Sequence, residues 1–492
     1  MFTERWQMEH LSGRLQAYIS LDYFALRGNY FKAALGDTQA SGAFSLSRPR
    51  DQRYRERLAL LIHVDGTTVE RGKAYVPYKL PGGLPEWLEE GPRAGRLSDV
   101  TFAYQGQIHT RPFELARRVA LSGHIEEGHI QYHADWPEVR DLSGFISVGG
   151  RDVRIDVSRG LSFDGTDLSG SYIHLKDNAS VADIDLVSTT TVAEALTFIR
   201  TTPLKEWMSF VTPDWRGNGP IRMVGSLSVP LKLAAEHIGE VDPADELEVD
   251  LDIELNGADL DLPGYGVSLG ALAGTVHYTY PYQISGADVD GQIFDRPAVF
   301  GASSDEDSVV FHVNGQAPYA DVLELLEMQD PGLMHGGFDF IADLHIELGD
   351  EISRLSLVSD LTGLGLELPG ELAKAADDSV PTELTLQFLD DYQAARFRYG
   401  PARGWLHVNE VLLRGAIGFA MPPPQLDYEQ KLLVLGGRVR GFSLDELMRE
   451  TEEGGESGPG FILALPVQLD GLFADHSDVS GVFFGTVMLD GR

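Results

Sequence analysis

The chain has 492 residues, with 39 Lys or Arg against 75 Asp or Glu, so its formal net charge at pH 7 is −36. Nucleic acid and anionic membrane surfaces bind clustered cations, and this charge balance argues against either as a main partner. The sequence contains no cysteine, which excludes disulfide bonds, thiolate metal sites and cysteine nucleophiles.

The N-terminal region lacks the apolar segments that would enter a membrane. Residues 1–10 are charged and do not form the apolar core of a signal peptide. The longest apolar runs of the chain, residues 58–62 and 461–465, are five residues long, whereas a helix needs about 20 to span a bilayer. We therefore predict no transmembrane segment in this chain.

Alternation of apolar and polar residues is the dominant pattern from residue 146 onward. In residues 246–255 (ELEVDLDIEL) every second side chain is apolar and the others are acidic. Residues 338–348 repeat the pattern, and shorter copies occur at 146–148, 153–157 and 384–388. A period of two residues predicts strands with one buried and one solvated face. The fold class is therefore mostly β.

Helical patterns are few and short. Residues 192–200 (VAEALTFIR) follow a run of threonines that can supply an N-cap, and they end before Pro203. Residues 319–329 form a second candidate that ends before Pro331, and residues 443–449 form a weaker third. The polar stretch 452–459 is the best candidate for a linker or loop.

These pieces recur in the same order, which suggests a degenerate repeat. The helix at 192–200 leads to an alternating strand and then to LDLPG at 260–264. The helix at 319–329 likewise leads to the strand at 338–348 and to LELPG at 366–370. Repeated half-buried strands indicate units stacked on their neighbours, and chance similarity of leucine-rich strands is the alternative.

Motifs for catalysis or metal binding are weak. We find no nucleophile elbow, P-loop, dinucleotide fingerprint or zinc-protease motif. His129 and His133 lie in a predicted strand, where residues four apart are about 13 Å distant, so a shared metal ion is not expected. Residues 288–291 (DVDG) resemble the start of a calcium loop, but no closing Glu follows, and a hairpin turn fits better. A β-helix acting on polysaccharide is the main enzyme alternative, and it is disfavoured because asparagine is scarce. We predict a chain that is not an enzyme and has no cofactor or metal.

Several segments together resemble one known family. Residues 359–374 (SDLTGLGLELPGELAK) are similar to a stretch of the YhdP branch of the AsmA-like proteins. The same branch shows motifs like YVPYKLP at 75–81, Trp136-Pro137 with LSG at 142–144, TPL at 202–204 and the strand at 225–231. The resemblance runs from about residue 70 to the C-terminus. The family's N-terminal membrane helix is absent, and the tryptophan expected in residues 436–448 is missing.

The resemblance implies an elongated, curled (taco-like), largely antiparallel sheet that forms an apolar groove with a few short helices at its rim. It also implies a periplasmic segment whose parent protein is anchored in the inner membrane and carries phospholipid to the outer membrane. Without the resemblance, the apolar stripes would more simply be the core of a closed sandwich. The alternative function is a β-rich adaptor that binds other envelope proteins through its sheet edges.

We predict that acyl chains contact the apolar stripes, and we divide the chain accordingly. The candidate groove-lining residues are Ile146, Val148, Val153, Ile155, Val157, Leu247, Val249, Leu251, Ile253, Leu255, Phe338, Phe340, Leu344, Ile346 and Leu348. The predicted segments are a β-rich part at 1–97, groove modules at 98–215 and 216–330 that each end in a short helix, and a third module at 331–492 containing the loop 452–459.

Overall fold

The computed structural model is mostly β-sheet, as the alternation predicts. It describes residues 9–36, 38–50, 56–73, 90–107, 117–131, 136–149, 152–162, 165–176, 181–202, 204–208, 211–230, 247–280, 283–304, 308–325, 330, 332–347, 353–368, 370–389, 391–409, 412–426, 433–440, 467–475 and 480–487. The chain divides into two compact units. The first unit comprises Met1–Ser209, Pro220–Glu254 and Tyr278–Pro281, and the second unit comprises Phe210–Gly219, Leu255–His277 and Tyr282–Arg492. The four-segment division stays a prediction.

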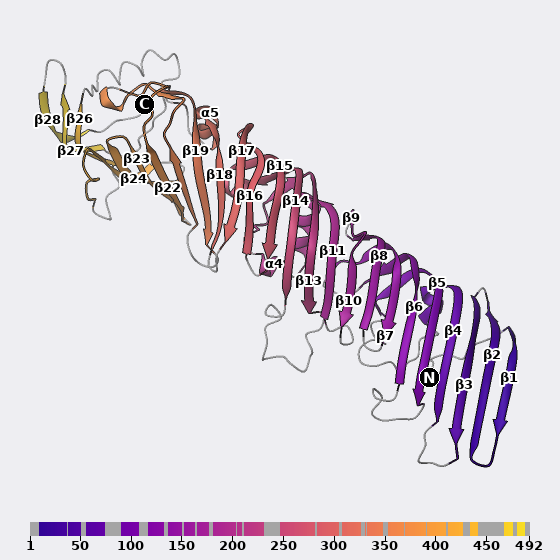
Figure 1. Ribbon diagram of the computed structural model, residues 1–492. Helices are drawn as coiled ribbons and strands as arrows, with labels where there is room; N and C mark the ends of the chain where they lie inside the picture. Colours follow the sequence, from indigo (N-terminus) through magenta and orange to yellow (C-terminus); the bar gives the residue numbers. More distant parts are fainter. Residues whose placement is uncertain are drawn as a thin grey trace. The chain divides into compact units, whose positions relative to one another are not determined.

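The first unit is an antiparallel sheet with three short helices. Its strands are β1 (His10–Ile19), β2 (Tyr23–Leu35), β3 (Thr38–Pro49), β4 (Arg57–Thr68), β5 (Pro92–Gln107), β6 (Arg117–Ile130), β7 (Val139–Gly149), β8 (Asp152–Ser162), β9 (Thr166–Asp167), β10 (Tyr172–Lys176), β11 (Val181–Thr191) and β13 (Pro220–Pro230). Its helices are α1 (Val69–Lys73), α3 (Val192–Thr201) and α4 (Leu204–Trp207). Strands β1 to β8 pair in chain order, and β10, β11 and β13 follow (Figure 1).

The second unit is also mostly antiparallel. Its strands are β12 (Arg216–Asn218), β15 (Val267–Thr279), β16 (Gln283–Ile293), β17 (Arg296–Ser304), β18 (Ser308–Pro318), β19 (Met334–Glu347), β20 (Arg354–Ser359), β21 (Leu364–Leu366), β22 (Thr382–Phe388), β23 (Gln393–Tyr399), β24 (Ala402–Val408), β25 (Leu412–Phe419), β26 (Leu433–Arg440), β27 (Val467–Asp475) and β28 (Ser480–Val487). It also contains α5 (Tyr319–Leu325) and the 3₁₀ turns η2 (Pro263–Tyr265) and η3 (Gly370–Leu372). Strand β26 runs parallel to both β25 and β27.

Strand β14 (Glu248–Leu262) confirms the clearest alternation in the sequence, and the boundary between the two units falls within it. Val249 and Leu251 are buried, whereas Glu248, Asp250 and Asp252 are exposed. In β19, Phe338, Phe340 and Ala342 are buried in the same alternating way. Both segments are therefore strands with one covered face.

Local signals also placed α3 and α5, whereas the short helices α1 and α4 were not predicted. Thr191 is the N-cap of α3, and its side chain and that of Glu194 form a reciprocal capping box. Helix α5 begins at Tyr319 as expected. The candidate helix at 443–449 and the polar loop 452–459 lie outside the described residues. The runs LDLPG and LELPG each lead into a 3₁₀ turn, η2 and η3, which supports the predicted repeat.

The expected hairpin turn at residues 288–291 is wrong. Asp288 lies inside β16 with φ of +57°, and the register against β17 shifts between Gly286 and Val289, as in a β-bulge. The chain turns a few residues later, where Phe294 and Asp295 both have positive φ. A short polar side chain such as aspartate tolerates the left-handed conformation, so the DVDG sequence fits a bulge as well as a turn.

Candidate functional site

In the first unit, the predicted groove-lining residues form part of a hydrophobic core. Register places Val148 opposite Val153 and Ile146 opposite Ile155, so these side chains share one face of the sheet. Val148, Val153, Ile155 and Val157 are buried, and Val153 has no exposed surface. Ile146 is half-buried against the same cluster. The side chains of this stretch pack on one another and leave little surface for a ligand.

The remaining predicted residues lie mostly in covered positions too. Leu247, Val249 and Leu251 belong to the same core cluster, and Ile253 packs against it. In the second unit Phe338, Phe340 and Ile346 are buried, whereas Leu255 and Leu344 are half-buried. Leu348 lies outside the described residues. The predicted groove-lining residues that are buried belong to the hydrophobic core. Their contact with lipid stays a prediction.

The same side of the first sheet continues toward the N-terminus as a long apolar surface. Cross-strand partners share a face of a sheet, and so do residues two apart on one strand. Leu121 of β6 lies opposite Val148 on β7 and opposite Phe102 on β5. The row of cross-strand partners two residues along from Leu121 lies on the same face. From β1 to β6 it consists of Leu15, Gly28, Phe44, Leu60, Tyr104 and Val119. We call this side the apolar face of the first unit.

Exposure of the apolar face falls along the sheet. On β1, Leu15 and Ile19 are 64% and 76% exposed. On β3 and β4, Phe44 and Leu60 are half-buried. Ile62 on β4 and Tyr104 on β5 are already buried, and from β7 onward the face is closed, as at Val153. One continuous apolar face is thus open to solvent at its N-terminal strands and becomes core further along.

The open part of the face was missed by the sequence reasoning. In residues 58–62 (LALLI) both faces of the strand carry apolar side chains, which hides the two-residue period. Only the register shows that Leu60 belongs with Phe44 and Tyr104, whereas Leu61 lies on the opposite face and is exposed. The weaker signal available was the alternation of Phe44 and Leu46 with Ser45 and Ser47.

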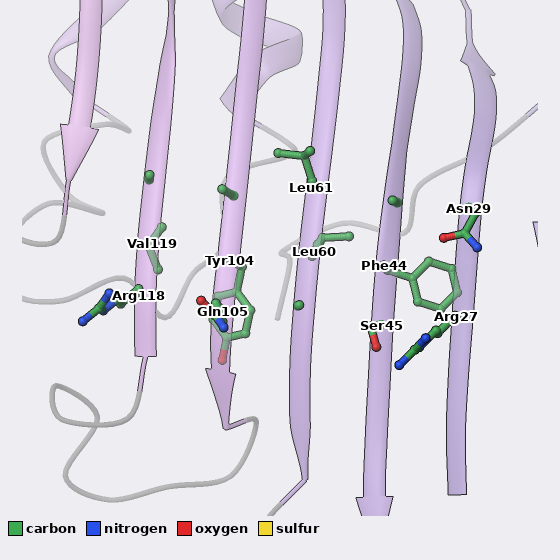
Figure 2. Close-up of a pocket in the computed structure, with 14 residues that line it drawn as sticks. Arg27, Asn29, Phe44, Ser45, Leu60, Leu61, Tyr104, Gln105, Arg118 and Val119 are labelled. Atoms are coloured by element: carbon green, nitrogen blue, oxygen red, sulfur yellow. The ribbon is translucent and has the colours of Figure 1, made fainter. Parts of the chain in front are cut away.

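A pocket of about 780 Å³ spans β2 to β6 (Figure 2). Its lining includes Phe44, Leu60, Tyr104 and Val119 of the apolar face, together with residues of the opposite side of the sheet, which we call the polar face. The polar-face residues of the lining include the cross-strand row Ala43, Leu61, Ala103 and Ala120. The next row begins at Arg27 and ends at Arg118, and these two arginines lie at opposite ends of the view. The volume suits a small molecule. Small side chains make the hollow, and exposed cations border it.

A compact ionic network lies beside the core at the β6–β7 connection. The carboxylate of Glu138 is 2.5 Å from Nε2 of His129 and 2.6 Å from Nε of Arg140, and Arg93 lies 3.6 Å away. Hydrogen bonds with His129 and Arg140 hold the pKa of Glu138 below its usual value. His129 therefore has a carboxylate partner, and His133 lies outside the described residues. Among the described side chains, no group of three or more His, Asp or Glu is placed to hold a metal ion.

These features define a class of mostly β protein whose sheet carries one apolar and one polar face. A family model for YhdP proteins matches residues 1–473, and the chain belongs to that family. The match confirms the resemblance and extends it to the N-terminus. Neither a curated protein nor a solved structure matches the chain. Family membership suggests AsmA-like lipid transport in the cell envelope. In the part of the chain that the structure describes, no helix is both long and apolar enough to cross a bilayer.

Proposed function

We propose that this chain is a periplasmic segment that carries phospholipid between the inner and outer membranes, with its parent protein anchored in the inner membrane. The role is non-enzymatic: acyl chains lie on the apolar face of the first unit while head groups stay in water. The observation that carries the proposal is the graded opening of that face, from exposed Leu15 through half-buried Leu60 to buried Val153.

The energetics of an acyl chain fit such a surface. Covering apolar surface yields about 25 cal/mol per Å², without any directional contact. Exposed Leu15 and half-buried Phe44 offer uncovered apolar area, whereas the buried residues from β7 onward offer none unless they separate. We therefore assign first contact with lipid to β1–β6. The stripes that contain Ile155 and Leu251 take part only if the closed region opens.

Leu60 and Leu61 provide a matched test, since both are leucines on β4 and they lie on opposite faces. A photo-crosslinking amino acid is placed at each position in the complete, membrane-anchored protein in cells, and crosslinked lipid is identified by mass spectrometry. We expect phospholipid adducts at position 60 and few at position 61. Both leucines line the pocket, so adducts only at position 61 would place the ligand on the polar face and overturn the proposal. Adducts at neither position would also contradict it.

A second candidate function, an adaptor for envelope proteins, is favoured by β1. Among the described strands only β2 pairs with β1, so the other edge of β1 has backbone groups available for another strand. In this case the protein, after lipid extraction, should still capture a defined envelope partner. Proline at Gln16, in the middle of β1, should abolish the capture. Loss of capture upon delipidation would favour lipid transport alone.

A further inference from the structure

A second exposed surface lies on the sheet of the second unit, and its end on β23 and β24 is cationic although the chain is strongly acidic. One cross-strand row passes through seven strands, β17, β18, β19, β20, β22, β23 and β24. Its residues are Val299, Asn314, Ile341, Val358, Glu383, Arg398 and Arg403. At about 4.8 Å per strand the row is about 29 Å long. We call this side the arginine face.

The apolar members of the row are exposed rather than packed. Val299, Ile341 and Val358 are 39%, 55% and 54% exposed. Their neighbours in sequence, such as Phe340 and Ala342, are buried on the other face. The core of this sheet therefore lies on the far side, and the three exposed side chains form an apolar strip. Asp339 and Asp343 flank Ile341 on the same face, and the row ends at arginines.

The cationic end of the row breaks a rule of strand pairing. Arg398 and Arg403 are direct cross-strand partners, and like charges in that position destabilise a sheet. Glu383 lies 3.8 Å from Arg398, but both side chains are more than half exposed, so the pair neutralises little. Among the described residues, none forms an ion pair or side-chain hydrogen bond with Arg403. An anion placed between the two guanidinium groups would relieve their repulsion.

Aromatic side chains border the arginines on the same face. Trp405 lies opposite Arg396, and the guanidinium of Arg414 lies 5.2 Å from the centroid of the Trp405 ring. His407 is 5.0 Å from Trp405 and stacks on Tyr392 at 4.6 Å. Burial, together with the charge of Arg414, lowers the pKa of His407, so the ring adds an aromatic surface rather than another charge near neutral pH.

We infer that the arginine face docks on a bilayer surface that contains anionic phospholipid. The inference goes beyond the proposed function, since it concerns the other unit and would hold even if no lipid entered the apolar face of the first.

Three features favour a bilayer as the occupant. Planar guanidinium groups bind phosphate oxygens in bidentate fashion. Tryptophan and tyrosine are typical of the membrane interface, and here Trp405 lies beside the arginines. The row also crosses seven strands over about 29 Å, which suits an extended surface rather than a small ligand. Salt screens charges beyond about 8 Å, so most of the net charge of −36 does not reach the docking face. The carboxylates on the face itself, Asp339, Asp343 and Glu383, oppose docking and are outweighed only at the arginine end.

The test uses the purified full-length chain and sedimentation with vesicles. One set of vesicles is phosphatidylcholine alone, and the other also contains phosphatidylglycerol. We expect binding to the anionic vesicles only, weakened by added sodium chloride. A basic residue near an anionic surface contributes about five-fold in affinity. Arg403→Gln should therefore weaken binding about five-fold, and the double variant with Arg398→Gln about 25-fold. The control is Arg216→Gln on β12, an exposed arginine away from the row, which should bind like wild type.

Thermal melting separates docking from a structural role. Arg403→Gln removes a like-charge pair, so it should melt at a higher temperature than wild type while binding less well. Ile341→Ser and Val358→Ser should weaken binding without changing its salt dependence. The proposal is overturned if wild type ignores anionic vesicles or if Arg403→Gln binds as Arg216→Gln does. It is also overturned if this face mediates a dimer that Arg403→Gln abolishes, because the occupant is then a second copy of the chain.

Discussion

The graded opening of the apolar face makes a sharp prediction about stability. Val153→Ala removes two methyl groups from a side chain with no exposed surface, in the middle of the core cluster. The lost transfer free energy is about 1.6 kcal/mol at about 0.8 kcal/mol per group. Incomplete collapse of the cavity adds to this, so we expect a loss of about 2 kcal/mol.

Leu15→Ala is the matched comparison on the same face. It removes more carbon than Val153→Ala does, but Leu15 is 64% exposed and only about a third of its surface is buried. A fully buried Leu→Ala change costs about 2–5 kcal/mol, and a third of that is about 1 kcal/mol. The larger truncation should therefore cost less. This reversal distinguishes an open face from one that is closed throughout.

Because the chain has two units, a single unfolding transition cannot be assumed. Hydrogen exchange followed by mass spectrometry, read on peptides from β8 and β1, reports the local free energy of opening. Val153→Ala should speed exchange in β8, and Leu15→Ala should leave β8 almost unchanged. Equal costs for the two variants, or a greater cost for Leu15→Ala, would show that β1 is packed and would refute the graded opening.

Three further predictions concern polar groups. The pKa of Glu138 is lowered in the folded protein, so its stabilising contribution is present above its ordinary pKa of about 4.5 and is lost as pH falls through the lower folded value. Glu138→Gln should therefore flatten the acid limb of a stability–pH curve, and an unchanged limb would contradict the assignment. Buried Lys374 donates hydrogen bonds to the carbonyl oxygens of Leu364 and Ala375 at 2.7 and 3.0 Å. Lys374→Met should destabilise the second unit by about 1–3 kcal/mol, measured by urea titration, since it leaves buried acceptors unpaired. EDTA should leave the melting temperature unchanged relative to sodium chloride at matched ionic strength, and a clear drop would reveal a metal site.

The two-residue period determined which segments are strands and which side chains share a face. In β14 this worked because the alternation of Val249 and Leu251 with acids is set by the backbone of each strand alone. Capping chemistry is equally local, and so the threonine run that ends at Thr191 predicted the start of α3. The YhdP motifs identified the family, which the alternation alone does not indicate.

Tertiary structure decided how far each face is covered. The alternation at Leu11 to Ile19 resembles that at Val153 to Val157, yet the first is exposed and the second is core. Burial depends on which neighbours pack over a strand, and those neighbours come from distant parts of the sequence. A two-residue period cannot distinguish a lipid-accessible surface from a closed core.

Register and bulges likewise depend on partners that no single segment specifies. Gly257, with φ of +74°, changes the phase of β14, so that Ala258 is buried although it is one residue out of step with Leu247 to Leu255. The pairing of Arg398 with Arg403 arises from a tight hairpin that brings two separate arginines face to face. The sequence alone determined the two faces of each strand, because backbone geometry is local. Only the fold determined which faces are open and which charges meet, because those depend on long-range pairing.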